Sequence, residues 1–316
     1  MNEFYFENNQ EPALLKEWEQ KVEEFVNIQL KNDKRVVLVT VWKSGGTAVP
    51  LESQPVRFLD NFSAGTRGST STEYFIKFGY SVIFLYRQYS FLPYSRSYYY
   101  GKDDFFDYFE ETQDSNGKND SGFKTVSRCK LNIYFSFILF LKAKLNNKLL
   151  MVPFFTITEY LFYLRMIAIN FRPLSKNAVF YLAAAVSDFF IPPERINDHK
   201  IHSEFPEKRL VIEFDPVPKF LAGLVEKWAP HANIVSFKLE TDTNLLISRA
   251  RASLQRYRHR LVIGNLLMKR KYEVVFVTDT EESWIRLSQA ESDEGIEIES
   301  KIVSRIVKLH NFWIQL

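Results

Sequence analysis

The chain has 316 residues, of which 46% are hydrophobic and 25% charged, so it is globular rather than disordered. Its net charge of +3 argues against nucleic acid as the main partner. The single cysteine, Cys129, excludes an intrachain disulfide and predicts a reducing compartment and an inert thiol. No secretory signal is visible, and the most apolar run, Tyr134–Leu141, is shorter than the roughly 20 residues that cross a bilayer. We therefore expect a cytoplasmic protein, with the nucleus as the alternative, that binds neither nucleic acid nor membrane.

Apolar runs and helical spacing predict alternating elements along the chain. In chain order these are a helix over 12–30, a strand over Val36–Val41, a helix over Ser69–Phe78, a strand over Tyr80–Tyr86, a helix over Ser127–Lys148, a strand over Leu149–Phe155, a helix over Thr158–Asn170, strands over Asn177–Val186 and Arg209–Phe214, a helix over Pro218–Trp228, a strand over Asn233–Phe237, a helix over Thr243–Tyr257, strands over Leu261–Ile263 and Glu273–Thr278, and a helix over Ile296–Leu309. This alternation predicts an α/β fold: one domain over 1–316, three-layered and Rossmann-like, with a mostly parallel sheet and helices on both faces.

Two segments interrupt the alternation. Residues 88–126 are rich in Ser, Tyr, Asp, Asn and Gly, and we expect a surface excursion that is partly disordered around Gln113–Gly122. Residues 191–208 are polar and contain prolines, which predicts a mobile flap.

Two glycine turns flank the first strand-to-helix transition, in Ser44–Thr47 and Ser63–Gly68. Glycine lets an anion approach the backbone closely, and the N–H groups at a helix N-terminus point towards it. Arg57 and Arg67 add positive charge, and Asn61 adds a neutral donor and acceptor. The spacing is neither a Walker A motif nor the dinucleotide fingerprint. The segment predicts a phosphate site, with ordinary turns as the alternative.

Other candidates follow predicted strands or lie in the flap. Asp188 closes one strand and could accept hydrogen bonds from a ligand, although a turn cap explains it equally well. Phe237 and Asn265 lie at carboxyl ends, where parallel sheets bind ligands; core packing is the alternative for Phe237. Lys200 could close over a triphosphate or be a surface lysine. His199 has no partner at a diagnostic metal-ligand spacing, and we expect no protein metal site.

Five segments carry a resemblance to a known family: VRFLDNFSAGTRG, FYLAAAVSDF, HKI, FDPVPKFL and SFKLETD. In this order they resemble the eukaryotic phosphopantothenoylcysteine synthetases, or phosphopantothenate–cysteine ligases, and most strongly the fungal branch. The resemblance covers the chain from Val36 to Leu309, with a poor match over 88–130. It implies a ligase of coenzyme A synthesis that joins 4′-phosphopantothenate to L-cysteine. An acyl-nucleotidylate would form from ATP or CTP, with release of pyrophosphate and nucleoside monophosphate.

The resemblance also implies the nucleotide site. The nucleotide phosphates would contact Gly45, Ser63, Gly65 and Gly68. Phe237 would pack on the base, and Asn265 would complete the site. Mg²⁺ would accompany the nucleotide, and no flavin is expected because the fused decarboxylase domain of many bacterial forms is absent.

The remaining implied roles concern the acyl substrate and the partners. The pocket would be lined by Asn61, Ala184, Ala185 and Asp188, with Asn61 also holding the reacting acyl phosphate. Lys200 would close over the triphosphate, so Asn61 and Lys200 are the implied catalytic residues. Family members are dimers with shared sites, in which Arg57 would reach the phosphate of the neighbour's phosphopantothenate. Association with other enzymes of the pathway is a further expectation.

One departure from the family pattern keeps two alternatives open. The family runs from its first strand directly into Ser-Gly-Gly-Thr, whereas Val41-Trp42-Lys43 intervenes here between Thr40 and Ser44. This puts the role of Gly45 in question and leaves a non-catalytic assembly partner as one alternative. An NADP-dependent reductase, with Arg87 facing a 2′-phosphate, is the other. The flap sequence, Lys200-Ile201-His202-Ser203, does not indicate which nucleotide is preferred.

Overall fold

The computed structural model describes residues 2–41, 49–54, 56–59, 65–96, 109–113, 119–125, 127–184, 189–201, 210–217 and 219–316. Its centre is an eight-stranded sheet in the order β14-β13-β12-β11-β8-β1-β4-β7. The strands are β1 (Val36–Val41), β4 (Ser81–Arg87), β7 (Leu149–Phe154), β8 (Ala178–Leu182), β11 (Asn233–Glu240), β12 (Leu261–Leu266), β13 (Glu273–Val277) and β14 (Glu282–Arg286). The strands from β7 to β12 are parallel, whereas β13 and β14 each run antiparallel to the preceding strand.

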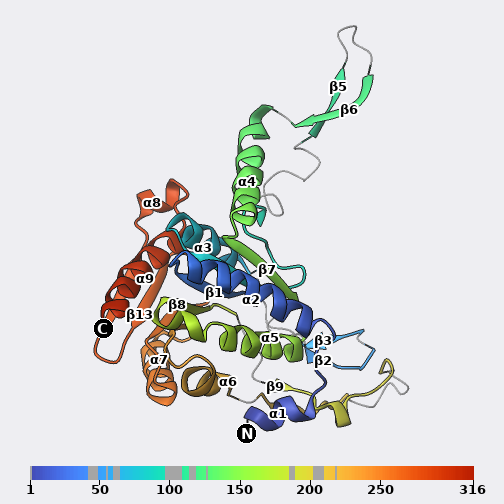
Figure 1. Cartoon of the computed structure of the whole chain (residues 1–316), viewed down its shortest axis with the longest axis vertical. Helices are drawn as coiled ribbons and strands as arrows, with labels where there is room; N and C mark the ends of the chain where they lie inside the picture. The colour runs from blue at the N-terminus through green and yellow to red at the C-terminus, as the bar shows by residue number, and fades with distance from the viewer. Residues whose placement is uncertain are drawn as a thin grey trace.

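Helices cover both faces of this sheet, as the alternation predicted (Figure 1). One face carries α3 (Thr66–Lys77), α4 (Ser127–Leu145) and α9 (Ile298–Gln315). The other carries α2 (Leu15–Lys31), α5 (Ile157–Asn170), the π-helical turn η5 (Leu224–Trp228) and α7 (Thr243–Tyr257). The central strand β1 is buried along its whole length, because helices cover both of its faces. This burial explains its nearly continuous apolar, valine-rich sequence.

The strand order creates a reversal point between β1 and β8. The chain builds β1, β4 and β7 outward in one direction and then returns to place β8, β11 and β12 on the other side of β1. Thr40 lies opposite Leu182 across the β1–β8 pair. Open α/β sheets bind ligands beyond the carboxyl ends of the strands at such a reversal.

Several element boundaries differ from the expectations. Helix α3 begins at Thr66 rather than Ser69, because Gly65 adopts a left-handed conformation (φ 77°) as its N-cap. Strand β8 ends at Leu182, and β11 continues to Glu240. The expected strand over Arg209–Phe214 is wrong. Residues 210–214 form no strand, and a short β10 (Asp215–Pro216) instead pairs with β9 (Phe189–Phe190).

Several elements had no counterpart in the sequence prediction or belong to segments expected to be irregular. They include α1 (Asn2–Asn8), α8 (Gln289–Asp293) and β14. They also include the two strands of an antiparallel ribbon, β5 (Phe109–Gln113) and β6 (Asn119–Thr125), inside the expected surface excursion. Residues 119–122 of the stretch expected to be disordered belong to β6, residues 114–118 lie outside the described residues, and the expected disorder stays a prediction.

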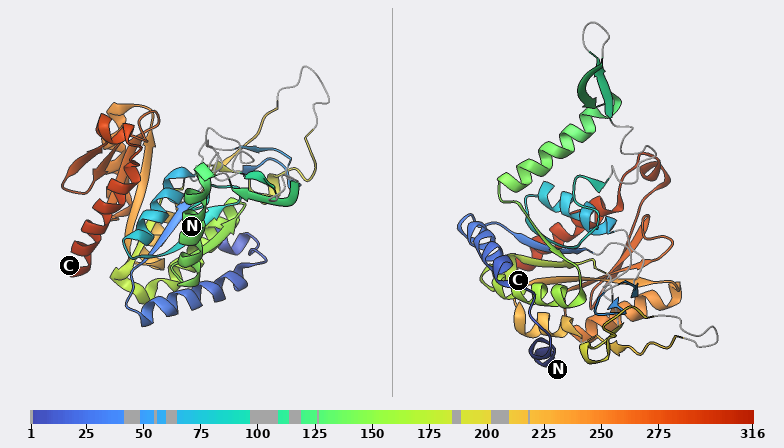
Figure 2. Two further views of the ribbon diagram at one scale, coloured as in Figure 1. Left: turned by 90° about the horizontal axis from the view of Figure 1, so that it is seen from above. Right: turned by 90° about the vertical axis from the view of Figure 1, so that its right-hand side faces the viewer.

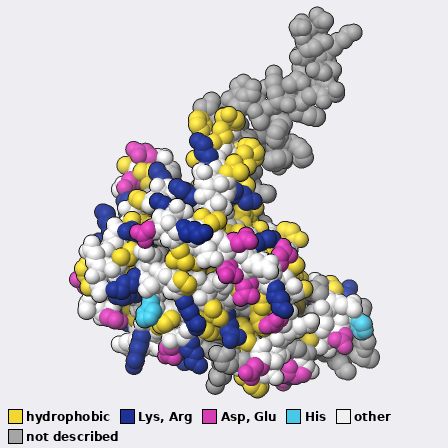
Figure 3. Space-filling model, in the orientation of Figure 1, with side chains coloured by type: hydrophobic (Ala, Val, Ile, Leu, Met, Phe, Trp, Pro, Cys, Tyr) yellow, Lys and Arg dark blue, Asp and Glu magenta, His cyan; other side chains and the backbone are white. Residues whose placement is uncertain are grey.

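The ribbon stands away from the body at the end of α4 (Figures 1 and 2). Hydrophobic side chains gather on the described part of α4 where it leaves the body (Figure 3). The most exposed include Tyr134, Phe137 and Leu145. Even so, a search of the helices in the described ranges finds none with the length and apolar character needed to cross a membrane.

Candidate functional site

The carboxyl ends of β1 and β8 are held together by a side chain. The hydroxyl of Thr40, which is fully buried near the end of β1, accepts a hydrogen bond from the N–H of Ala184 at 3.3 Å. Tyr160 from α5 also bonds to Thr40, and its burial raises the pKa of the Tyr160 hydroxyl. We call the ends of these two strands, together with the first turn of α3, the strand-end site. Ala184 therefore lies at the strand-end site, and its role in a substrate pocket stays a prediction.

The first turn of α3 begins directly beyond β1. A Cβ built on Gly68 would lie 2.0 Å from Cγ2 of Val41, so only glycine allows this close approach of helix and strand. Val41 pairs with Tyr86 of β4. The first of the three residues that depart from the family pattern, Val41-Trp42-Lys43, therefore belongs to β1. The N–H groups of a first helical turn lack partners within the helix and attract anions. Gly65 and Gly68 thus lie where a phosphate site was expected, although Gly68 is inside the helix.

Arg67 is directed away from solvent and is already engaged. Its Nη1 lies 3.3 Å from a carboxylate oxygen of Glu299 in α9, and its Nη2 donates to the carbonyl of Arg270. Burial raises the pKa of Glu299, and the charge of Arg67 opposes part of this effect. Arg67 therefore joins α3 to α9 rather than presenting a free charge to a ligand.

Phe237 and Asn265 lie on the same face of neighbouring strands at the carboxyl edge. Phe237 pairs with Ile263 in the sheet, and Asn265 follows two residues later. The ring of Phe237 packs edge-on against Tyr181, with centroids 5.0 Å apart, and the guanidinium of Arg67 lies 5.6 Å from its centroid. Phe237 is half-buried and Asn265 is buried. The structure therefore places these two predicted residues on one face of neighbouring strands, with Phe237 beside Arg67 of α3.

Arg57 and the flap meet at a carboxylate that the sequence analysis did not identify. Glu52 is fully buried in the loop after the short strand β2 (Val49–Pro50), which pairs with β3 (Phe58–Leu59). Its oxygens accept from the N–H of Arg57 at 3.2 Å and from the N–H of Ile201 at 3.3 Å. The Arg57 side chain lies 3.7 Å from Glu52 and donates to the carbonyl of Ile201.

These contacts bind the flap to the β2–β3 loop. Burial alone would raise the pKa of Glu52, but the two N–H groups and the charge of Arg57 outweigh it and lower that pKa. The N–H of Ser53 also donates to the carbonyl of Asn197 at 2.7 Å. Lys200, next to Ile201, is exposed. The structure thus places two predicted site residues, Arg57 and Lys200, on adjoining segments, with Glu52 between them.

The other predicted site residues cannot be placed. Five of them lie outside the described residues: Gly45, Asn61, Ser63, Ala185 and Asp188. Glu52 carries no signal in the sequence, because a single acidic residue in a polar loop is ordinary, and its partner Ile201 is 149 positions further along the chain.

Comparison with known proteins supplies the family. Residues 164–308 match the model of the DNA/pantothenate metabolism flavoprotein C-terminal domain. The chain is 41% identical to the phosphopantothenate–cysteine ligase CAB2 of Saccharomyces cerevisiae, over 99% of this chain and 86% of that protein. The chain belongs to the phosphopantothenate–cysteine ligase family. The mouse ligase is 40% identical over 96% of this chain and 95% of its own length. The resemblance and the expected enzyme class are therefore confirmed.

Solved structures agree with this assignment. A Cab2 mutant in complex with phosphopantothenate-cysteine superposes with a TM-score of 0.87 at 41% identity, covering 99% of this chain and 98% of that chain. A DNA/pantothenate metabolism flavoprotein from Streptococcus pneumoniae gives a TM-score of 0.56 at 17% identity, covering 88% and 99% of the two chains, which is a likeness of fold. The predicted Rossmann-like fold is confirmed.

Proposed function

We propose that this family member forms the amide between 4′-phosphopantothenate and L-cysteine, in coenzyme A biosynthesis, through an acyl-nucleotidylate made from ATP or CTP. The observation that carries the proposal is the strand-end site: the first turn of α3 follows β1 at the sheet reversal, held there by Gly68. The relative whose fold matches over nearly the whole chain was solved with phosphopantothenate-cysteine, the product of this reaction.

The chemistry explains why such a site needs phosphate-binding groups. A carboxylate is a poor acyl donor because it is anionic and has no good leaving group. Its attack on the α-phosphate of the nucleotide releases pyrophosphate and gives an acyl-nucleotidylate. The amine of cysteine then attacks the acyl carbon, and the nucleoside monophosphate leaves. The protein has to position the reactants and stabilise phosphate charge.

Nucleotide binding is assigned to the α3 side of the site. The first-turn N–H groups after Gly65 would hold the phosphates, with Gly45, Ser63 and Gly68. The helix dipole contributes about 0.3–1 kcal/mol to such binding. The half-buried ring of Phe237 would pack on the base, and Asn265, on the same face of the sheet, would complete the site.

The acyl substrate is assigned to the β8 side. Ala184, Ala185 and Asp188 would line its pocket, and Asn61 would hold the reacting group. Lys200 would close over the triphosphate. We further propose a homodimer in which Arg57 reaches the phosphate of the substrate bound to the neighbouring protomer, and association with other enzymes of the pathway.

Mg²⁺ would come with the nucleotide. The described ranges of the chain contain no group of three or more His, Cys, Asp or Glu placed to hold a metal ion. Mg²⁺ keeps several waters and is bound mainly by substrate phosphates in many nucleotide-dependent enzymes. It would neutralise phosphate charge during transfer. No flavin has a role in this reaction.

The proposal is tested by pyrophosphate release from purified protein with Mg²⁺, phosphopantothenate and either ATP or CTP, with and without cysteine. We expect release that depends on phosphopantothenate, and amide product only when cysteine is present. A folded protein that releases no pyrophosphate with either nucleotide would support the non-catalytic assembly partner. Deleting Val41-Trp42-Lys43 would then show whether those residues block activity. Binding of NADPH would support the reductase.

A matched pair of variants tests the flap. Lys200→Ala should reduce the rate of nucleotidylate formation at least tenfold, because it removes the charge expected over the triphosphate. Lys16→Ala, an exposed lysine on α2, should leave that rate unchanged. Equal rates in the two variants would remove Lys200 from the mechanism.

A further inference from the structure

A second concave surface lies between α3 and α9, apart from the strand-end site. It has a volume of about 400 Å³. We call it the α3–α9 groove. Its lining consists of Tyr74, Lys77, Phe78, Ser300, Lys301, Ser304, Arg305 and Lys308. It is formed by the C-terminal half of α3 and the middle of α9, whereas the strand-end site lies at the N-terminal turn of α3.

Four cationic side chains converge on this groove, and most have no carboxylate partner. Lys301 is held by Glu291 at 2.7 Å and donates to the carbonyl of Arg286. Within the described ranges, no ion pair engages Lys77, Arg305 or Lys308. The groove therefore carries an excess of positive charge.

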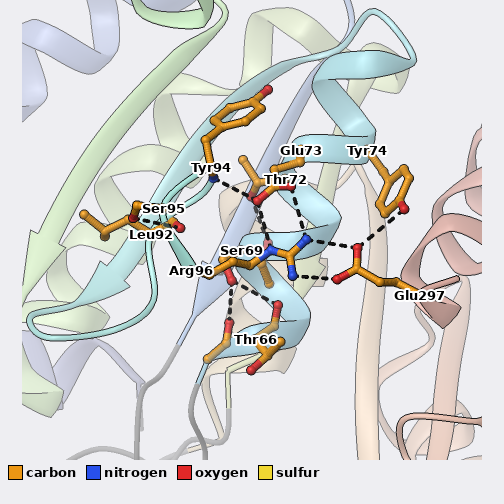
Figure 4. A network of polar contacts seen from close by, with 12 residues as sticks. Thr66, Ser69, Thr72, Glu73, Tyr74, Leu92, Tyr94, Ser95, Arg96 and Glu297 are labelled. Carbon is orange, nitrogen blue, oxygen red and sulfur yellow. Dashed lines mark hydrogen bonds and ion pairs between the residues drawn. The ribbon is translucent and has the colours of Figure 1, made fainter. Parts of the chain in front are cut away.

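Two further acidic residues, Glu73 and Glu297, bond to Arg96 close to Tyr74 (Figure 4). Arg96 donates to both oxygens of Glu73, at 3.0 and 3.2 Å, and to both oxygens of Glu297, at 2.5 and 2.9 Å. Tyr74 also donates to Glu297 at 3.4 Å. One guanidinium offsets only one of these two carboxylates, so a single negative charge remains beside the groove. With Glu291 paired to Lys301, the four cations of the groove still leave an excess of positive charge.

The side chains present favour phosphate over other anions. Lysine ammonium and arginine guanidinium groups bind phosphate oxygens strongly. The hydroxyl of Ser304 adds a donor of adjustable direction, whereas that of Ser300 already donates to the carbonyl of Glu297 at 2.7 Å. Tyr74 and Phe78 supply apolar surface at the same place. The volume is that of a small-ligand site rather than of a protein interface. Several cations spread over such a volume match a ligand with more than one phosphate group.

We propose that the α3–α9 groove is a second binding site, for a small ligand that bears two or more phosphate groups. Its occupancy bears on the strand-end site, because the Arg67–Glu299 ion pair joins the first turn of α3 to the start of α9, directly before Ser300 and Lys301 of the groove. A ligand that draws the C-terminal half of α3 towards α9 acts on the helix whose first turn faces the strand ends. This site is additional to the one assigned to the ligase reaction and does not depend on that assignment.

The test uses inorganic tripolyphosphate as the probe, titrated into the full-length protein by calorimetry at low ionic strength. The double variant Arg305→Gln/Lys308→Gln should weaken binding at the groove at least tenfold. The control, Lys16→Gln/Lys31→Gln, removes the same charge from exposed positions on α2 and should change affinity less than twofold. Equal weakening in both variants would show non-specific attraction and overturn the proposal, as would unchanged binding in the groove variant.

Hydrogen exchange separates the two sites and needs no turnover. Tripolyphosphate should slow exchange of the amides in 74–78 and 300–308 in the wild type and the control, and not in the groove variant. Protection confined to the first turn of α3 would overturn the proposal while leaving the ligase assignment intact. A groove that binds a polyglutamate peptide but not tripolyphosphate would also overturn it, in favour of an acidic protein partner.

Discussion

At the amino ends of the parallel strands, buried polar side chains of helices bond to strands and to the short turns beside them, whereas at the carboxyl end a buried carboxylate bonds to the N–H groups of two loop segments far apart in the chain. At the amino edge Gln29 donates to the carbonyl of Asn147 and accepts from Ser81, both at 2.8 Å. At the carboxyl edge Glu52 accepts from two loop N–H groups. The first arrangement ties helices to strands, and the second positions segments that have to meet substrates.

Two buried histidines form further hydrogen bonds at the amino edge. The N–H at Nε2 of His310 donates to the carbonyl of Lys176 at 2.8 Å, so its Nδ1 accepts from the hydroxyl of Tyr80 at 2.6 Å. His259, which precedes β12, bonds to Ser236 at 2.8 Å. Both histidines are buried, and burial lowers the pKa of each to about 4. The hydrogen bonds of these two histidines therefore stabilise the fold only while the histidines are neutral.

The largest expected effect is a pH dependence of the free energy of unfolding that comes from the histidines of the amino edge. The pKa of each histidine is about 4 in the folded state and 6.5 when unperturbed, so the unfolded state binds more protons between these values. The contribution of each histidine to the free energy of unfolding should be constant above pH 6.5. It should fall by about 3 kcal/mol per histidine as the pH is lowered from 6.5 to 4. Denaturant unfolding at pH 7.5 and 4.5 measures it. His310→Gln should lose less stability between these pH values than His199→Gln, an exposed control; equal losses would contradict the prediction.

The next effect concerns activity at the carboxyl edge. Glu52→Gln keeps the side chain's size but removes the charge that holds Arg57 and the flap. We expect ligase kcat to fall about 100-fold, or about 2.7 kcal/mol, with the melting temperature nearly unchanged. The control is Glu273→Gln, another carboxylate paired with an arginine but remote from the site on β13. If both variants keep full activity, the flap is not positioned by Glu52.

A glycine substitution tests the packing that holds the strand-end site. Gly68→Ala places a methyl group 2.0 Å from Val41, and the strand or helix has to shift. We expect a loss of about 2 kcal/mol in the free energy of unfolding. Gly264→Ala, whose Cβ would lie 2.9 Å from a methyl group of Val275, should cost less. The opposite ranking in denaturant unfolding would show that helix and strand are not tightly held there.

The smallest effect belongs to a single amino-edge hydrogen bond. Tyr80→Phe removes the donor to Nδ1 of His310 and should lower the free energy of unfolding by about 1 kcal/mol. Ligase activity should not change, because Tyr80 precedes β4 at the edge opposite the site. A large loss of activity at unchanged stability would contradict the functional separation of the two edges.

The sequence predicts the elements whose signal is local. Val36–Val41 and Thr243–Tyr257 have the expected bounds, because one is a continuous apolar run and the other starts after the capping residue Asp242. The start of α3 is missed because Gly68 resembles a loop glycine although it packs inside a helix. Strand β11 is longer than expected because Glu240, which reads as a loop residue, is buried and paired with Arg249 at 2.9 Å.

The roles given to the site residues stay predictions. Phe237 and Asn265 lie on one face at the same edge because neighbouring strands of a parallel sheet end there, and sequence order is enough to predict this. The engagement of Arg67 by Glu299 and of Glu52 by Ile201 depends on contacts between segments more than 140 positions apart, and no local pattern encodes them.

The reversal of strand order has a consequence for how the molecule can be divided. The half with β1, β4 and β7 and the half with β8, β11 and β12 are each continuous in the chain, and within the sheet they meet only where β1 pairs with β8. A cut in the connecting turn η3 (Arg172–Asn177) would give two fragments, neither of which contains a complete strand-end site. Catalysis by the mixed fragments would therefore show that they have reassembled, so η3 is a suitable place to divide this chain into a split enzyme.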